Sequence, residues 1–349
     1  MTRYGRSLPA PWQTTQARTP WREHLDMERD DDVLPSVIEA IGCTPLVELR
    51  RIVTLCGLQG RLLAKLEYLN PGFSMKDRIA LAIIRQARLC GALRPGQTVV
   101  ELTSGNTGTG LAIVCRALGH PFVAVMSRGN TEERARMMRA LGAEVVLVDQ
   151  APGSEPHRVS GDDLALVEQK AQELTIERGA FRADQFRLPA NVQAHQDHTG
   201  PEIWRQCGGR LDAFVAFVGT GGTFTGVARF LRSKNPAIRC YVAEPATAPA
   251  LAGKPITNPS HRIQGGGYSM RQLPLLDCSL VTDYLTVTDH QAIAAARLLA
   301  REEGIFAGIS TGANLAAAMA LLADRERTAT IALIVCDSGL KYLSTDLFP

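Results

Sequence analysis

Residues 214–233 read FVAFVGTGGTFTGVARFLRS, and this stretch sets the fold class. Its start, 214–218, is a short run of aromatic and apolar residues, which is typical of a buried strand. Closely spaced glycines follow, and a helix is predicted to run from them to about Ser233. Because backbone N–H groups converge at such a turn, it is a candidate phosphate site, with a simple tight turn as the alternative. Phe224 stands where the dinucleotide-binding fingerprint needs glycine, and the Gly-Lys-Ser/Thr of a Walker motif is missing.

Short apolar runs and amphipathic stretches alternate on both sides of this unit. The alternation predicts an α/β protein with a mostly parallel sheet and helices on both faces. The predicted strands are 62–66, 98–102, 122–126, 144–148, 214–218, 240–243, 284–287 and 330–335. The predicted helices include 75–89, 108–118, 132–141, 164–178 and 289–303.

The composition limits the class of protein. The chain has 349 residues, enough for about two domains or one large α/β domain. A net charge of +3 argues against a nucleic-acid-binding protein, which normally carries a dense basic stripe. No apolar run approaches the roughly 18 residues of a membrane-spanning helix. The eight cysteines include no Cys-x-x-Cys pair, so we expect reduced, mostly buried thiols and a cytoplasmic protein.

Three segments fall outside the strand–helix pattern. Residues 1–32 are polar and punctuated by proline and tryptophan, and we expect them to form an extension before the folded body. The segments 150–163 and 247–276 are rich in glycine and proline and show no convincing period. Long irregular loops in a compact α/β protein often line or cover its site, so we expect this of both segments.

A second strand-to-helix turn, residues 101–108, reads ELTSGNTG. Its hydroxyl and amide side chains, together with backbone N–H groups, suit a carboxylate ligand. Plain N-capping of the helix by Thr103 or Ser104 is the alternative explanation.

The segment 70–78 reads NPGFSMKDR and places Lys76 at the start of a predicted amphipathic helix. A single lysine is usually a solvated side chain. At a helix N-terminus, however, the helix dipole lowers the pKa of an amine. Since an amine of lowered pKa is what Schiff-base chemistry needs, Lys76 is a candidate covalent catalyst.

In chain order, 70–78, 103–108 and 219–223, the three segments together resemble the pyridoxal-phosphate enzymes of the cysteine synthase (O-acetylserine sulfhydrylase) and cystathionine β-synthase group. Four further motifs carry the same resemblance, which extends over about residues 33–349: IGCTPL at 41–46, TGPEIW at 199–204, GISTG at 308–312 and YLST at 342–345. The resemblance implies an α/β fold type II enzyme, similar to the tryptophan synthase β subunit, with two open twisted sheets and helices on both faces of each.

The resemblance also implies the site residues. Lys76 would form the Schiff base with pyridoxal 5'-phosphate and later move the α-proton of the substrate. Asn106 would bind the ring hydroxyl of the cofactor, and Ser310 would face its ring nitrogen. The remaining residues would hold the cofactor phosphate (Gly219, Thr220, Gly221, Gly222 and Thr223) and the substrate (Thr103, Ser104, Gly105, Thr107, Gln185 and Gly266).

The implied reaction is β-replacement on an activated L-serine, O-acetylserine or O-phosphoserine, through an α-aminoacrylate to L-cysteine or a related β-substituted alanine. A neutral hydroxyl at the ring nitrogen does not enforce its protonation, which favours loss of a β-leaving group. The alternatives are a cystathionine β-synthase-like or amine-accepting (diaminopropionate-type) synthase, a serine or threonine dehydratase, and a scaffold without turnover. Tyr268 stands where sulfhydrylases have small residues, so we expect an acceptor larger or more polar than sulfide.

The resemblance further implies how the chain is organised. Residues 70–186 would form a small mobile domain that carries the Schiff-base lysine and the substrate-carboxylate loop. Residues 33–69 and 187–349 would form the large pyridoxal-phosphate-binding domain, with the cofactor in the cleft between the two. We expect a homodimer that acts on small molecules, with neither nucleic acid nor membrane as a partner.

Two polar clusters remain. His195 and His198 stand one helical turn apart, which could suit a metal ion, but we expect a structural role and no metal. Arg134, Arg136 and Arg139 are expected on a solvated helix face, with contact to an anionic substrate or partner as the alternative.

Overall fold

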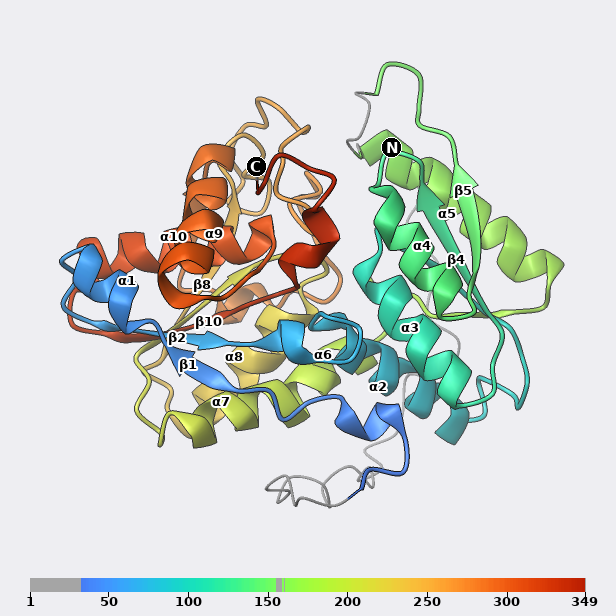
Figure 1. Ribbon diagram of the computed structural model, residues 1–349, viewed down its shortest axis with the longest axis horizontal. Coiled ribbons are helices and arrows are strands. Elements are labelled where there is room, and N and C mark those ends of the chain that lie inside the picture. The colour runs from blue at the N-terminus through green and yellow to red at the C-terminus, as the bar shows by residue number, and fades with distance from the viewer. Residues whose placement is uncertain (1–32, 155–158, 160, 349) are drawn as a thin grey trace.

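The protein is described by a computed structural model at residues 33–154, 159 and 161–348, so the expected extension 1–32 and part of the segment 150–163 lie outside the described residues. Figure 1 shows two groups of elements side by side, each built around its own sheet. One sheet has six strands and the other has four.

The six-stranded sheet has the order β1-β2-β10-β7-β8-β9. Its first strand, β1 (Leu46–Glu48), runs antiparallel to β2 (Arg61–Lys65), and every other neighbouring pair is parallel. The remaining strands are β7 (Ala213–Phe217), β8 (Arg239–Pro245), β9 (Asp283–Val287) and β10 (Thr330–Ile334).

The four-stranded sheet has the order β5-β4-β3-β6, and all of its pairs are parallel. Its strands are β3 (Val99–Leu102), β4 (Phe122–Ser127), β5 (Glu144–Val148) and β6 (Phe181–Arg182). Parallel strands are usually buried on both faces, which explains why β3 and β4 are buried along their whole length.

Alternate residues of each sheet pack against helices on opposite faces. In β7, Val215 belongs to the apolar cluster beneath α9 (Asp289–Glu303) and α10 (Ile309–Ala323), whereas Phe214 packs with α8 (Gly222–Lys234). The other helices are α1 (Arg50–Leu55), α2 (Lys76–Leu89), α3 (Asn106–Ala117), α4 (Glu132–Ala140), α5 (Gly161–Glu177), α6 (Ala190–Ala194) and α7 (Gly200–Gln206), with a π-helical turn at His195–Thr199. Among the described helices, none combines the length and apolar character that a membrane crossing requires.

The predicted α/β class is confirmed, and the eight predicted strands are all present with ends within two residues of the observed ones. The pattern missed β1 and β6, which are too short to show a period, and the helices α1, α7 and α10. The segment 247–276 contains no helix or strand, as expected.

The expectation of mostly buried cysteines is wrong for part of the set. Cys115, Cys207, Cys240 and Cys336 are buried, but Cys56, Cys90 and Cys278 are exposed. Cys56 and Cys90 directly follow α1 and α2, so each lies at a helix end that reaches the surface.

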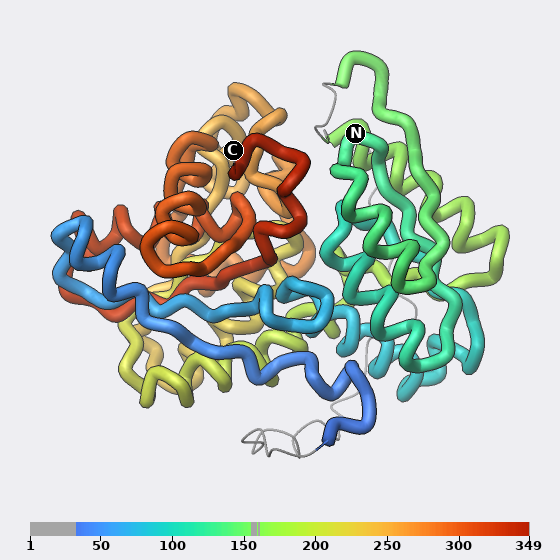
Figure 2. The backbone as a smooth tube through the Cα atoms, in the orientation of Figure 1, coloured from blue at the N-terminus to red at the C-terminus, as the bar shows by residue number. Residues whose placement is uncertain are grey.

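The loops that follow β3, β7 and β10 carry the polar segments of interest. Because parallel strands end at the same edge of a sheet, chemistry in open α/β folds gathers at their carboxyl ends. Figure 2 shows the C-terminal segment after β10, in red, on the side of its group that faces α3 and α4. Thus the C-terminal segment reaches the turn that opens α3, where Lys341 contacts Asn106.

Candidate active site

Lys76 is the first residue of α2 and is almost completely buried, with 8% of its surface exposed. Its backbone N–H donates to the Ser74 hydroxyl over 3.3 Å. Burial lowers the pKa of the Lys76 amine, and the acidic groups of Cys336 and Asp337 oppose this shift. A buried amine of lowered pKa is more often neutral near physiological pH, and only the neutral amine can act as a nucleophile.

The turn 219–223 forms a cradle in which positions 219, 221 and 222 require glycine. A Cβ at Gly219 would lie 2.3 Å from the carbonyl oxygen of Gly265, and one at Gly222 would lie 2.1 Å from Oδ1 of Asn191. Gly221 has a φ of 90°, in the left-handed region that favours glycine. The turn opens the N-terminus of α8, whose backbone N–H groups and dipole attract an anion. These features fit a phosphate group.

Two side chains from α6 and the π-helical turn brace this cradle. Asn191 Nδ2 donates to the Thr220 hydroxyl over 3.0 Å. Both ring nitrogens of His195 are engaged, one with Thr223 Oγ1 at 3.0 Å and the other with Thr199 Oγ1 at 2.9 Å. His195 therefore links the turn 219–223 to Thr199 at the end of the π-helical turn. Within the described residues, no group of three or more His, Cys, Asp or Glu side chains is arranged to hold a metal ion.

The turn 103–107 follows β3 and opens α3. Thr103 Oγ1 accepts the backbone N–H groups of Gly105 and Gly108, both at 2.9 Å, so it satisfies one N–H of the first turn of α3, although the residue at the N-cap position is Gly105. The Thr107 hydroxyl donates to Gln185 Oε1 over 2.6 Å.

One pocket gathers residues from these separate segments. It is lined by Lys76 of α2, Ser104, Asn106 and Thr107 after β3, Gln185, and Thr220 after β7, together with Arg134, Tyr268 and Tyr342. A larger pocket of about 950 Å³ adjoins it, shares Ser104 and Tyr268, and is lined by Gly266. A third small pocket is lined by Gly219. The other predicted site residues do not line these three pockets: Thr103, Gly105, Gly221, Gly222, Thr223 and Ser310.

Sequence reasoning missed Asp337 and Lys341, which contact Asn106 of this pocket, and it assigned Arg134 of the pocket lining to a solvated helix face. Asp337 and Lys341 approach Asn106 from the C-terminal segment, and their position after the carboxyl end of β10 is the signal that could have found them. Arg134 was expected on a solvated helix face. This expectation is wrong, because only 2% of the Arg134 surface is exposed. Its Nη1 donates to the carbonyl oxygen of Ser104 over 2.7 Å, in the space that Gly105 leaves open.

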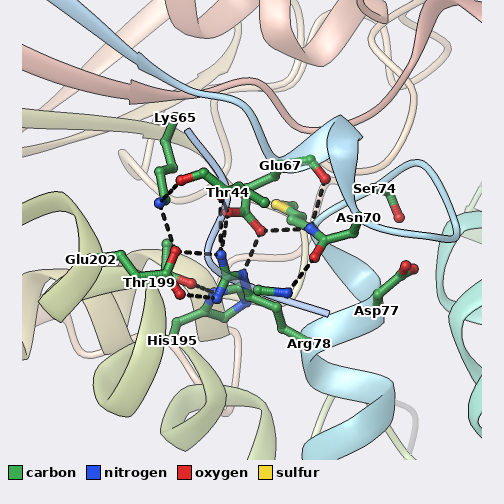
Figure 3. Close-up of polar contacts among 12 residues, drawn as sticks. Thr44, Lys65, Glu67, Asn70, Ser74, Asp77, Arg78, His195, Thr199 and Glu202 are labelled. Carbon is green, nitrogen blue, oxygen red and sulfur yellow. Dashed lines mark hydrogen bonds and ion pairs between the residues drawn. The ribbon is translucent and has the colours of Figure 1, made fainter. Parts of the chain in front are cut away.

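A buried ion cluster is centred on Arg78, two residues after Lys76 in α2 (Figure 3). Arg78 donates from Nε to Glu67 at 2.6 Å and from Nη1 to Glu202 at 2.7 Å. Lys65 Nζ lies 2.6 Å from the same Glu202 carboxylate. Two cations thus meet two carboxylates, and the neighbouring Arg78 and Lys65 charges hold the pKa of Glu202 below its ordinary value despite burial. The cluster ties α2 to β2 and α7.

The geometry can be compared with known proteins. Residues 37–337 match the model of a family described as "Pyridoxal-phosphate dependent enzyme". The chain belongs to this family. The cofactor of this chain is therefore pyridoxal phosphate, and the buried amine of Lys76 and the glycine cradle at 219–223 fit it.

Individual relatives narrow the comparison. The chain is 40% identical over 316 residues to a cysteine synthase of Staphylococcus aureus, covering 90% of this chain and 96% of the relative. It is 42% identical over 318 residues to cysteine synthase A of Escherichia coli, covering 88% and 93%.

Solved structures agree with the observed fold. O-ureido-L-serine synthase is similar with a TM-score of 0.81 and 39% identity, covering 91% of this chain and 96% of that one. O-acetyl serine sulfhydrylase isoform 3 from Entamoeba histolytica has a TM-score of 0.83 and 34% identity, with 93% of both chains covered. The expected fold type II architecture is confirmed by these similarities.

Proposed function

We propose that this protein catalyses pyridoxal-phosphate-dependent β-replacement on an activated L-serine, O-acetylserine or O-phosphoserine, and forms L-cysteine or a related β-substituted alanine. The observation that carries the proposal is the pocket in which the buried amine of Lys76 and the α3 residues Asn106 and Thr107, all within 70–186, meet Thr220 from the turn after β7 of the six-stranded sheet. Relatives named cysteine synthase and O-ureido-L-serine synthase support the same class of reaction.

Each segment of the site has a proposed task. The bound cofactor supplies an electron sink for negative charge at the substrate Cα. Lys76 holds the cofactor covalently and carries the proton to and from Cα. Burial lowers the pKa of this amine, which suits it to proton transfer. Gly219, Thr220, Gly221, Gly222 and Thr223 bind the phosphate, Asn106 the ring hydroxyl and Ser310 the ring nitrogen. Thr103, Ser104, Gly105, Thr107, Gln185 and Gly266 surround the substrate.

The direct test is turnover of O-acetylserine and O-phosphoserine with sulfide, measured by cysteine release. Lys76→Ala is expected to lose turnover by several orders of magnitude, as removal of a covalent catalyst does. Lys234→Ala, at the exposed far end of α8, is the matched control and is expected to keep wild-type activity. Wild-type-like turnover in Lys76→Ala would refute the proposed role of Lys76.

We propose further that the acceptor is larger or more polar than sulfide, with sulfide accepted as a small nucleophile. Tyr268 supports this proposal because it lines both the site pocket and the adjoining pocket of about 950 Å³. The test is competition between sulfide, homocysteine and glutamate at equal concentration, with products identified by mass spectrometry. If sulfide reacts faster by several orders of magnitude and Tyr268→Ala leaves that ranking unchanged, the protein is a cysteine synthase and Tyr268 does not select the acceptor.

The organisation of the chain is proposed on the same basis. Residues 70–186 would move as a small domain against 33–69 plus 187–349, and the strands of the four-stranded sheet all fall within the first range. We also propose a cytoplasmic homodimer. Light scattering of the holoenzyme measures the oligomeric state, and small-angle scattering with and without substrate measures closure.

A further inference from the structure

A chain of hydrogen bonds reaches Asn106 from the C-terminal segment. Lys341 Nζ donates to Asn106 Oδ1 over 2.7 Å, and Asn106 Nδ2 donates to Asp337 Oδ2 over 2.8 Å. Both C-terminal side chains are buried, Lys341 at 1% and Asp337 at 0% exposure. The two contacts cross the gap between the two groups of elements, since Asn106 opens α3 whereas Asp337 and Lys341 follow β10.

The chemistry of these partners fixes which way the Asn106 amide faces. An ammonium group only donates hydrogen bonds, and an ionised carboxylate only accepts them. A flipped amide would set its NH2 group against the Lys341 ammonium and its carbonyl oxygen against the Asp337 carboxylate. Both contacts would be repulsive, and in a buried site each would leave an unsatisfied polar group. Only one amide orientation satisfies both neighbours.

One donor of Asn106 remains after these bonds are made. A side-chain amide has two N–H hydrogens and one carbonyl oxygen. Asp337 takes one hydrogen and Lys341 takes the carbonyl oxygen, so the amide has an N–H left for a further acceptor in the pocket that it lines with Lys76. The ring oxygen of pyridoxal phosphate is such an acceptor.

Other contacts hold the two orienting side chains themselves. Lys341 Nζ also donates to the carbonyl oxygen of Gly72, over 2.8 Å, in the turn that precedes Lys76. The Tyr342 hydroxyl donates to the same Asp337 oxygen over 2.9 Å. Burial lowers the pKa of Lys341 to about 8, and the charges of Asp337 and Asp77 oppose the shift. Burying this ammonium is therefore costly, and its donor bonds compensate for lost hydration.

We propose that Lys341 and Asp337 are positioning residues, which fix the Asn106 amide so that it presents an N–H, and never its carbonyl oxygen, to the ring hydroxyl of the cofactor. The proposal rests on the proposed role of Asn106 in binding that hydroxyl. Neither Lys341 nor Asp337 needs to touch the cofactor for this effect.

The experiment compares Lys341→Met, Lys341→Arg and Asn106→Ala. For each variant, the apoenzyme is titrated with pyridoxal phosphate to give a Kd, and the absorption band of the bound cofactor is recorded between pH 6 and about 9, a range that spans neutral pH and the pKa of Lys341. Lys341→Met is expected to raise the Kd about ten- to hundredfold, the range of one hydrogen bond to a charged group, and to move the absorption band. Lys341→Arg keeps a donor-only cation and is expected to stay within about threefold of wild type.

Two comparisons separate this inference from the proposed function. If Asn106→Ala leaves the Kd and the absorption band unchanged, the proposed role of Asn106 fails. If Asn106→Ala changes both but Lys341→Met changes neither, only the positioning proposal is overturned. In the double variant, Lys341→Met must add nothing to Asn106→Ala, because Lys341 acts through the amide; additive losses would also overturn the proposal.

A loss of folding is controlled separately. Lys65→Met removes another buried lysine, which pairs with Glu202 rather than Asn106, so it is expected to lower the melting temperature without moving the cofactor absorption band. Where Lys341→Met does not fold, Asp337→Asn decides, since it keeps the size of the side chain and removes its obligate-acceptor character. An unchanged absorption band and Kd in folded Asp337→Asn would overturn the proposal.

Discussion

Lys76 and Arg78 lie two residues apart at the start of α2, and both are buried, yet their surroundings differ in kind. Burial acts to lower the pKa of both side chains. The ion pairs of Arg78 with Glu67 and Glu202, at 2.6 and 2.7 Å, reverse that shift, whereas Cys336 and Asp337 do not reverse it at Lys76. The same turn of helix thus carries a cation that its partners keep charged and an amine that burial drives toward neutrality. Burial alone does not decide the charge of a side chain; the partners do.

The largest expected effect comes from removing the Lys76 amine. Lys76→Met should lower turnover by about three orders of magnitude or more, because no amine remains to bind the cofactor covalently. The free energy of unfolding of the apoenzyme should equal that of wild type or exceed it by up to about 1 kcal/mol, since a buried amine has been replaced by an apolar group of similar length. Steady-state assay and urea unfolding measure the two quantities, and a strongly destabilised apoenzyme would show that Lys76 has a structural role instead.

The next largest effect is expected from removing the ion pairs of Arg78. Arg78→Met should lower the free energy of unfolding by about 3–5 kcal/mol, because Glu67 loses its guanidinium partner and Glu202 keeps Lys65 but loses the second of its two cationic partners. Arg50→Met is the matched control, since its ion pair with Glu48 is exposed and is expected to contribute less than about 1 kcal/mol. Equal losses in the two variants would contradict the assignment of Arg78 as the anchor of α2.

A smaller effect sharpens the role of guanidinium geometry. Arg78→Lys keeps the charge but cannot donate to both carboxylates with the same planar fork. We expect a loss of about 1–3 kcal/mol, intermediate between wild type and Arg78→Met, and cofactor affinity reduced less than stability. Urea unfolding of the apoenzyme together with pyridoxal phosphate titration measures both; a loss as large as in Arg78→Met would mean that charge contributes nothing.

The smallest expected effect is a pH dependence. The pKa of Lys76 is lowered in the folded protein. Between that lowered pKa and the ordinary value of 10.5, Lys76 therefore binds more protons in the unfolded chain than in the folded one. Its contribution to the free energy of unfolding of the apoenzyme therefore rises with pH over that window. The difference between wild type and Lys76→Met isolates this slope. A difference that falls with pH would show a raised pKa at Lys76 and contradict its neutral character.

Several site residues could be predicted because their signals are local. The glycines at 219, 221 and 222 follow a strand and open a helix, and Lys76 begins an amphipathic helix; both patterns occupy fewer than about ten residues of sequence. The role of Arg134 could not be predicted this way. It lies on α4, and its burial depends on segments distant in sequence: the turn after β3, where it donates to Ser104, and the Tyr342 ring, 5.0 Å from its guanidinium carbon.

The sequence by itself determined the α/β class, the order of its elements, the glycine-rich turn at 219–223 and the candidate lysine, because periodicity, glycine spacing and helix starts act over short distances along the chain. Only the tertiary structure decided the order of the strands within each of the two sheets, the ion cluster that joins Arg78 to Glu202, and the contacts of Asn106 with Asp337 and Lys341. Asn106 is separated from these two partners by 231 and 235 residues. Such pairs meet only when both sheets have formed and packed, so no local pattern encodes them.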